Sequence, residues 1–130
     1  MQPPPGVTTY ESEVATLWFE ADGILVSLSK SPRRTVENLG ANIALVKKIT
    51  GGKKPPLLIY LSPSPVPDKA ARAFAAEQLP HVYKAMAMVS SSGLGKLIMN
   101  FLFALKPPTI PMKSFADEGR AREWLRQFLA

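Results

Sequence analysis

The chain has 130 residues, of which 46% are hydrophobic, and a formal net charge of +6. This length suits one domain with one core, and the absence of cysteine excludes disulfides, thiolate metal sites and cysteine nucleophiles. The N-terminal residues lack a signal-peptide pattern, and no apolar run approaches the ~20 residues that span a bilayer. We therefore expect a cytoplasmic protein with a flexible N-terminus over 1–10 and one domain over 11–130.

The first half of the chain predicts three strands and a helix. Residues 11–20 and 24–28 are rich in Val, Leu, Trp and Phe, and the Asp-Gly pair between them is typical of a hairpin turn. Residues 35–49 carry apolar side chains at helical spacing, followed by two glycines. Residues 57–61 form a short apolar run between prolines, which suits a buried strand.

The second half alternates helices and strands. We expect an Ala-rich helix over 68–79 that Pro80 stops, a strand over 83–89, an apolar helix over 94–105, a short strand over 112–115 and a last helix that Asp117 caps. In the last helix the apolar residues follow the i, i+3, i+4 pattern. We expect Trp124 to anchor that helix on the sheet, because an aromatic side chain buries a large apolar area.

The resulting element order is β-β-α-β-α-β-α-β-α. Strands that alternate with helices imply right-handed crossovers and a mainly parallel sheet. The first strand enters through a hairpin and is therefore antiparallel to the second. We predict a single α/β domain with a mixed, mostly parallel sheet of about five strands and helices on its faces.

The segment 94–105, LGKLIMNFLFAL, is the most unusual part of the chain. Only Lys96 and Asn100 interrupt its apolar character, and they lie on one narrow stripe. A helix on a sheet needs an apolar stripe only about 100° wide. Either the loops 62–67 and 107–111 bury the rest of this helix, or it meets a membrane surface, a lipid, an apolar ligand or a second copy of the chain.

The residues before this helix are a candidate anion site. Serine hydroxyls, backbone N–H groups and a lysine at a helix start would hold a phosphate or carboxylate, and the segment follows a predicted parallel strand, where α/β sheets usually bind ligands. The alternative is that these serines only cap the helix. Together with the apolar helix, the candidate ligand-binding residues are Ser91, Ser92, Gly93, Lys96, Asn100, Phe101 and Leu105.

Patterns that would indicate catalysis are missing. His81 is the only histidine, and the carboxylates show no spacing that pairs two of them for acid–base work. No metal-ligand cluster, Walker motif or dinucleotide fingerprint is present. The basic residues are not interleaved with aromatic ones, as nucleic-acid binding would favour. We expect no enzyme activity, no metal, no cofactor and no nucleic-acid partner.

The C-terminal third carries a more specific pattern: an apolar helix that contains Asn, a Lys-Pro turn, a short strand that ends in Phe, and an Ala-x-x-Trp-Leu helix. These residues are Asn100, Lys106, Pro107, Pro111, Phe115, Ala121, Trp124 and Leu125, and Arg72 and Phe74 match in the preceding helix. This pattern and the element order resemble the STAS and SpoIIAA-like domains, in particular a bacterial family of STAS and CRAL-TRIO-like domains. The resemblance covers roughly residues 12–130.

The resemblance implies a non-enzymatic interaction or regulatory module with a protein partner or a homodimer. STAS antagonists are switched by phosphorylation of a Ser in an Asp-Ser-Ser-Gly-like motif. Here the segment starts with Tyr60 instead of an acidic residue, so Ser62 and Ser64 are interpreted as turn residues. The similarity to CRAL-TRIO domains and the apolar helix support the alternative: binding of a lipid, an apolar ligand or a membrane surface.

Overall fold

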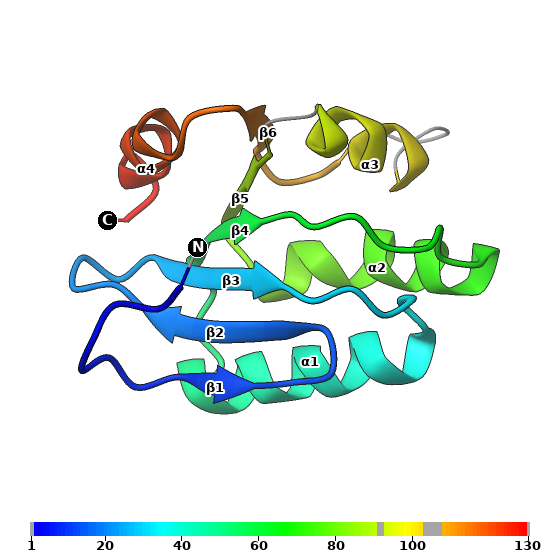
Figure 1. The fold of residues 1–130 in the computed structure, drawn as a ribbon, viewed down its shortest axis with the longest axis horizontal. Coiled ribbons are helices and arrows are strands. Elements are labelled where there is room, and N and C mark those ends of the chain that lie inside the picture. The colour runs from blue at the N-terminus through cyan, green and yellow to red at the C-terminus, as the bar shows by residue number, and fades with distance from the viewer. Residues whose placement is uncertain (1, 91–92, 103–107, 130) are drawn as a thin grey trace.

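The computed structural model describes residues 2–90, 93–102 and 108–129, and only the backbone of residues 101 and 102. Within these residues it contains six strands and four helices, shown in Figure 1. The strands are β1 (Tyr10–Glu11), β2 (Ala15–Phe19), β3 (Leu25–Ser29), β4 (Pro56–Tyr60), β5 (Ala85–Val89) and β6 (Met112–Phe115). The helices are α1 (Val36–Thr50), α2 (Lys69–Val82), α3 (Leu94–Leu102) and α4 (Glu118–Arg126).

All six strands form one sheet in their sequence order. The pairs β1–β2 and β2–β3 are antiparallel, and β3 to β6 are parallel. The predicted α/β class and mixed sheet are confirmed, as is the hairpin entry, with Gly23 at a φ of 100° in its turn.

The strand count differs from the prediction because the segment 11–20 is two strands. The hydroxyl of Ser12 accepts hydrogen bonds from the backbone N–H groups of Val14 (3.3 Å) and Ala15 (3.1 Å). A serine that satisfies the backbone two and three residues ahead closes a turn. The chain therefore reverses after β1, and Tyr10 pairs with Leu17.

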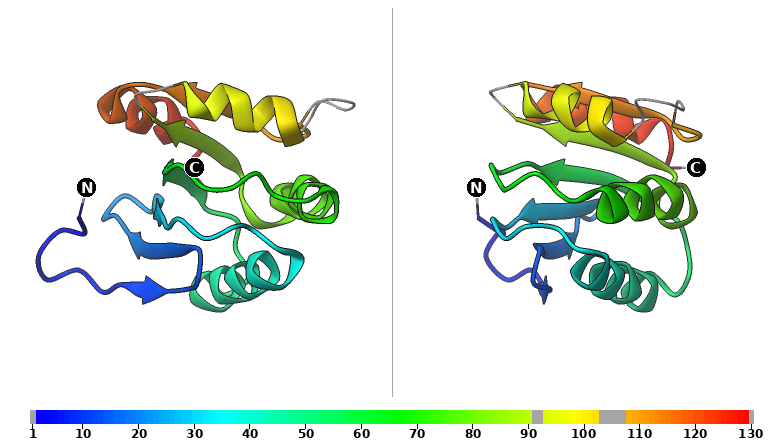
Figure 2. Two further views of the ribbon diagram at one scale, coloured as in Figure 1. Left: turned by 45° about the vertical axis from the view of Figure 1, so that its right-hand side comes forward. Right: turned by 90° about the vertical axis from the view of Figure 1, so that its right-hand side faces the viewer.

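Three helices cover one face of the sheet and one helix covers the other (Figures 1 and 2). Helices α1, α2 and α3 each connect two neighbouring parallel strands. Right-handed crossovers between strands in sequential order place every connecting helix on the same face. Helix α4 follows the last strand and returns along the opposite face. We call these surfaces the three-helix face and the α4 face.

Local signals at both ends fix the limits of helix α1. Thr35 and Asn38 form a capping box, in which each side chain accepts a hydrogen bond from the other residue's backbone N–H. At the C-terminus Gly51 adopts the left-handed conformation with a φ of 63°. Both signals are local, and the helix lies within one residue of its predicted limits.

The prediction that Pro80 stops α2 is wrong, because the helix continues to Val82. Pro80 lies in the last turn, where its missing N–H costs only one helical bond. The N–H of Tyr83 still bonds to the carbonyl of Leu79 at 3.1 Å, and Val82 is buried in the core. Tertiary packing therefore holds the turn that the proline disfavours, and β5 begins at Ala85 instead of residue 83.

Successive side chains of a strand point to opposite faces of the sheet, so each face has its own core. Leu25 and Leu57 point to the three-helix face, where they meet Val46. On the α4 face, Trp18, Val26, Leu58 and Leu125 are buried together.

The anchor of α4 differs from the expected one. Leu125 and Ala121 are fully buried, whereas Trp124 is only partly buried. The Trp124 ring packs at 5.7 Å from the Phe115 ring on edge strand β6 and at 5.1 Å from the Phe128 ring. Because the small Ala121 lets the helix approach the sheet, Leu125 takes the central position and Trp124 covers the edge.

Candidate functional site

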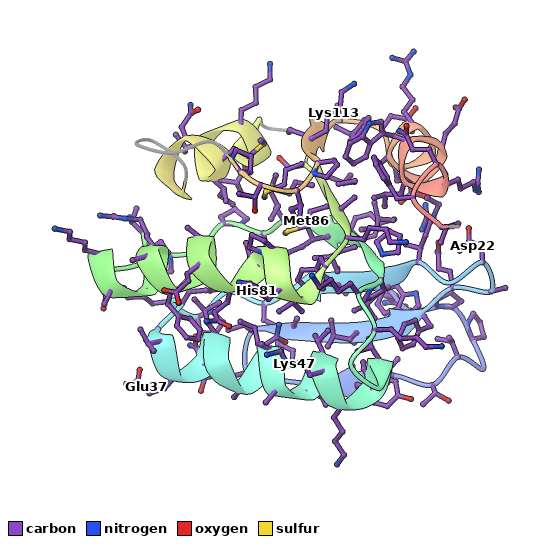
Figure 3. All side chains as sticks on the ribbon, turned by 180° about the vertical axis from the view of Figure 1, so that it is seen from behind. Asp22, Glu37, Lys47, His81, Met86 and Lys113 are labelled. Carbon is purple, nitrogen blue, oxygen red and sulfur yellow. The ribbon has the colours of Figure 1, made fainter. Side chains whose placement is uncertain are left out.

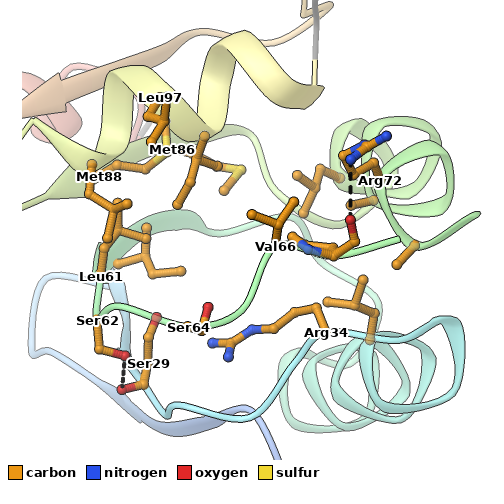
Figure 4. A pocket seen from close by; sticks show the side chains of 18 of the residues that line it. Ser29, Arg34, Leu61, Ser62, Ser64, Val66, Arg72, Met86, Met88 and Leu97 are labelled. Carbon is orange, nitrogen blue, oxygen red and sulfur yellow. Dashed lines mark hydrogen bonds between the residues drawn. The ribbon is translucent and has the colours of Figure 1, made fainter. Parts of the chain in front are cut away.

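An apolar cavity of about 250 Å³ lies on the three-helix face, between α2, α3 and the segment 61–67 (Figure 4). We call it the α2–α3 cavity. Residues of β4, β5 and β6 form its floor, and it extends to the carboxyl ends of β3 and β4. Its lining consists of Ser29, Arg34, Leu39, Ile59, Leu61, Ser62, Ser64, Pro65, Val66, Pro67, Ala71, Arg72, Ala75, Leu79, Met86, Met88, Leu94, Leu97, Ile98 and Met112.

Small side chains and methionines keep this space open. Helix α2 presents Ala71 and Ala75 to the cavity, and their methyl groups fill little of it. Met86 and Met88 alternate along β5 and form the floor, where Figure 3 shows Met86 in the interior of the domain. Methionine is flexible and polarizable, so a methionine floor adapts to ligands of different shape.

The apolar surface continues onto the rim. Among the described residues, Val36, Val66 and Leu97 are the large hydrophobic side chains that remain exposed. Two of them line the cavity: Val66 is 53% exposed and Leu97 is 52% exposed. Figure 4 shows both beside the opening, Val66 on the loop and Leu97 on α3. The sheet therefore leaves part of the apolar surface of α3 uncovered.

Polar groups gather on the side of the cavity near the start of α1. Figure 4 shows Arg34, Ser29, Ser62 and Ser64 there, opposite Met86. The Ser62 hydroxyl donates to the carbonyls of Ser29 (3.1 Å) and Lys30 (3.3 Å). These bonds tie the loop after β4 to the end of β3.

Arg34 is held by backbone carbonyls. Its Nη1 donates to the carbonyls of Lys30 (2.6 Å) and Pro32 (2.7 Å), and its Nη2 donates to the carbonyl of Val14 (3.2 Å). Burial lowers the pKa of its guanidinium from the ordinary value. In the described part of the chain no carboxylate forms an ion pair with it.

The predicted ligand residues that the structure describes lie outside the cavity lining. Gly93 has a φ of 75°, and its carbonyl accepts from the N–H of Lys96 at 3.1 Å. The Ser90 hydroxyl accepts from the N–H of Leu94 at 3.2 Å, which is capping geometry. Lys96 and Asn100 are exposed. The anion site at this helix start stays a prediction.

Ser91, Ser92, Leu105 and the Phe101 side chain lie outside the described residues. The helix that the sequence singled out nevertheless forms a cavity wall, through Leu94, Leu97 and Ile98.

Sequence reasoning missed the opposite wall and the floor. Arg34 precedes α1 by two residues, and nothing in its local pattern distinguishes it from Arg33. The one available signal was the Pro-Ser loop 62–67, since a loop of this kind at the carboxyl end of a parallel strand often borders a ligand site.

A second polar cluster lies on the α4 face. Arg122 Nε and Nη2 bond the two carboxylate oxygens of Glu20 at 3.0 and 2.9 Å, and Nη2 also donates to the Tyr60 hydroxyl at 3.1 Å. The Tyr60 hydroxyl donates in turn to Glu118. Burial, and then the bond to Glu118, raise the pKa of Tyr60 to about 12. These four residues, the Arg122 clamp, join α4 to the sheet.

The part of the chain that the structure describes shows neither a metal-ligand cluster nor a membrane-spanning helix. No three side chains of the His, Cys, Asp and Glu types come together there as a metal site would require. His81 lies in the last turn of α2, as Figure 3 shows, and is exposed. None of the described helices has the length and apolar character that crossing a membrane requires.

Comparison with known proteins identifies a family. The chain belongs to the family described as "Domain of unknown function (DUF7793)", whose model matches residues 17–129. Among solved structures it is similar to an uncharacterised protein of the DUF3478 family with a SpoIIAA-like fold from Shewanella loihica PV-4. The two share 17% sequence identity with a TM-score of 0.56, over 96% of this chain and 98% of that one. A search of curated proteins found no match. The likeness confirms the SpoIIAA-like fold that the sequence pattern predicted.

Proposed function

We propose that this member of the DUF7793 family is a non-enzymatic binding module that holds an apolar small molecule in the α2–α3 cavity. The observation that carries the proposal is the continuity of the cavity with the exposed side chains of Val66 and Leu97. Ligand sites are concave and mostly apolar, with a few polar groups that orient the ligand. An apolar interior that opens onto an apolar rim has this character.

The composition of the lining supports binding without catalysis. As far as the structure describes it, the lining holds serines and arginines but no histidine, aspartate or glutamate. General acid–base catalysis needs a group that exchanges protons near neutral pH. Serine hydroxyls and an arginine guanidinium do not provide one unaided.

A second candidate is the docking of a protein partner or a second copy of the chain on the same rim. Val66 and Leu97 would then pack against another chain instead of a ligand, in keeping with the interaction role that the STAS resemblance implies. A membrane surface would use the same two side chains.

Fluorescence of the neutral probe N-phenyl-1-naphthylamine separates these functions. We expect saturable enhancement by the wild-type protein. Ala75→Leu adds a side chain inside the cavity, so it should weaken probe binding about tenfold or more. The matched control is Ala73→Leu, which places the same side chain on an exposed position of α2 and should leave binding unchanged.

The other candidates predict different results. If the rim is a protein interface, light scattering should show a dimer that Leu97→Ser dissociates, and the probe should not saturate. If it is a membrane surface, liposomes should sediment the wild type but not Leu97→Ser. Equal probe binding by Ala75→Leu and the wild type would refute the ligand site.

A further inference from the structure

We infer that the ligand of the α2–α3 cavity is a medium-chain carboxylic acid, with its chain against Met86 and Met88 and its carboxylate at Arg34. This inference rests on the proposed ligand-binding function and adds the chemical class of the ligand. It follows from three properties of the cavity: its polarity, its charge and its size.

The cavity has two chemically different ends. Figure 4 shows Met86, Met88 and Leu97 at one end and Ser29, Ser64 and the guanidinium of Arg34 at the other. An apolar molecule without a head group would leave the second end unmatched. A molecule with a polar head and an aliphatic chain matches both, because each part meets groups of its own kind.

The charge at the polar end is positive and uncompensated by any described carboxylate. The three carbonyl bonds fix Arg34 in place but carry no formal charge to balance it. A guanidinium has five N–H donors, and the three bonds to the carbonyls of Lys30, Pro32 and Val14 leave donors for a ligand oxygen. A half-buried cation that is fixed in this way favours an anionic head group, because charge-assisted hydrogen bonds are the strong ones.

The head group carries one negative charge. Arg72 also lines the cavity, but Figure 4 shows it on α2, apart from Arg34, where its Nη1 bonds to the carbonyl of Pro67 at 3.2 Å and braces the loop. A head group at Arg34 therefore meets one guanidinium. A phosphate monoester would bring a charge of about −1.5 to −2 at neutral pH, more than the single guanidinium of Arg34 balances. A carboxylate brings one charge and accepts hydrogen bonds on two oxygens.

The volume sets the chain length. At about 30 Å³ for a group the size of a water molecule, 250 Å³ holds roughly eight such groups. A methylene group is of similar size, so an acid of about eight carbons fills the space. Longer chains would extend past Val66 and Leu97 into solvent.

Displacement of N-phenyl-1-naphthylamine, with calorimetry as an independent readout, tests the ligand class. We expect octanoate to bind at least about tenfold more tightly than 1-octanol or octylamine, and the advantage of octanoate over 1-octanol should shrink at high salt. Each methylene added between hexanoate and octanoate should strengthen binding about fourfold, and the gain should level off beyond that length.

Ser64→Asp tests the head-group position without replacing Arg34. Ser64 is exposed and lies on the same side of the cavity as Arg34 in Figure 4. An aspartate there would repel a carboxylate, so octanoate should bind about tenfold less tightly while 1-octanol is unaffected. Ser64→Asn has the shape of the aspartate without its charge, so the comparison of the two variants isolates the charge: octanoate should bind Ser64→Asp about tenfold less tightly than Ser64→Asn.

The outcomes separate this inference from the proposed function. Equal binding of octanoate and 1-octanol, or a Ser64→Asp variant that binds octanoate normally, overturns the carboxylate and leaves the apolar site standing. Tighter binding of octyl phosphate than of octanoate overturns the choice of head group. Failure of the wild type to bind the neutral probe at all refutes the site itself.

Discussion

The two faces of the sheet differ in how their helices pack against the strands. On the α4 face a single short helix brings two fully buried side chains, Ala121 and Leu125, against the strands, and the Arg122 clamp fastens it. On the three-helix face, the α2–α3 cavity lies beside α2 and α3 over Met86 and Met88. The face with more helices is the one that is incompletely filled.

The difference separates the side chains that stabilise the fold from those that border the proposed ligand site. A filled core gains from every buried methylene, whereas a hollow one forfeits contacts along its walls. On the α4 face the side chains of Ala121 and Leu125 are fully buried, so they stabilise the fold. The three-helix face gives up packing in a region that extends to the carboxyl ends of β3 and β4, and the carboxyl ends of strands are the usual position of a ligand site in an α/β sheet.

The largest expected contrast is between two leucines, one from each face. Leu125→Ala should lower the free energy of unfolding by ~2–5 kcal/mol, because Leu125 is fully buried and its removal opens a void. Leu97→Ala should change it by less than ~0.5 kcal/mol, because Leu97 is 52% exposed. Urea unfolding of both variants measures the contrast. Similar losses for the two would mean that α3 is packed as tightly as α4.

A smaller loss should follow from Gly95→Ala on α3. A Cβ at Gly95 would lie 3.0 Å from the Ser114 Cβ and 3.2 Å from the Met88 Cβ. This close approach holds α3 against β5 and β6, so the extra methyl group should cost ~1–3 kcal/mol of stability. Thermal unfolding tests this prediction, with Ala73→Ser as the surface control. Gly52→Ala cannot serve as a control, because Gly52 has a positive φ that alanine disfavours. An unchanged melting temperature would show that α3 shifts outward freely.

The smallest expected effect on stability at neutral pH is that of Tyr60. This effect grows above pH 10. Its folded pKa of about 12 exceeds the ordinary value of 10.0, so the unfolded state loses its proton first as the pH rises. The stabilisation is therefore complete below pH 10 and is lost between pH 10 and about 12. Tyr60→Phe should have a flatter decline of stability with pH in this window, measured by urea unfolding at pH 8, 10 and 11. An identical decline in both proteins would mean that the buried Tyr83, whose pKa burial also raises, dominates the alkaline loss.

Local chemistry made much of the architecture predictable. The Asp-Gly turn, Gly51 and Asp117 each act through their immediate neighbours, and the structure places all three as expected. The order of strands and helices then restricts the topology, because crossovers are right-handed. The family pattern around Trp124 and Leu125 also predicted the SpoIIAA-like fold, because its residues lie in elements that follow one another in the sequence.

Contacts between segments far apart in the sequence determine the features that local patterns did not predict. The extension of α2 past Pro80, the division of the first strand at Ser12 and the choice of Leu125 over Trp124 as anchor each depend on what a segment meets in space. The sequence identified the segment 94–105 as an unusually apolar helix, but it did not show which face lines a cavity. Arg34, the loop 62–67 and α3 line one cavity only after the sheet has formed, and residues this far apart leave no common pattern in the chain. Periodicity and caps are properties of neighbours, whereas a cavity is a property of the distances between elements, which only tertiary packing sets.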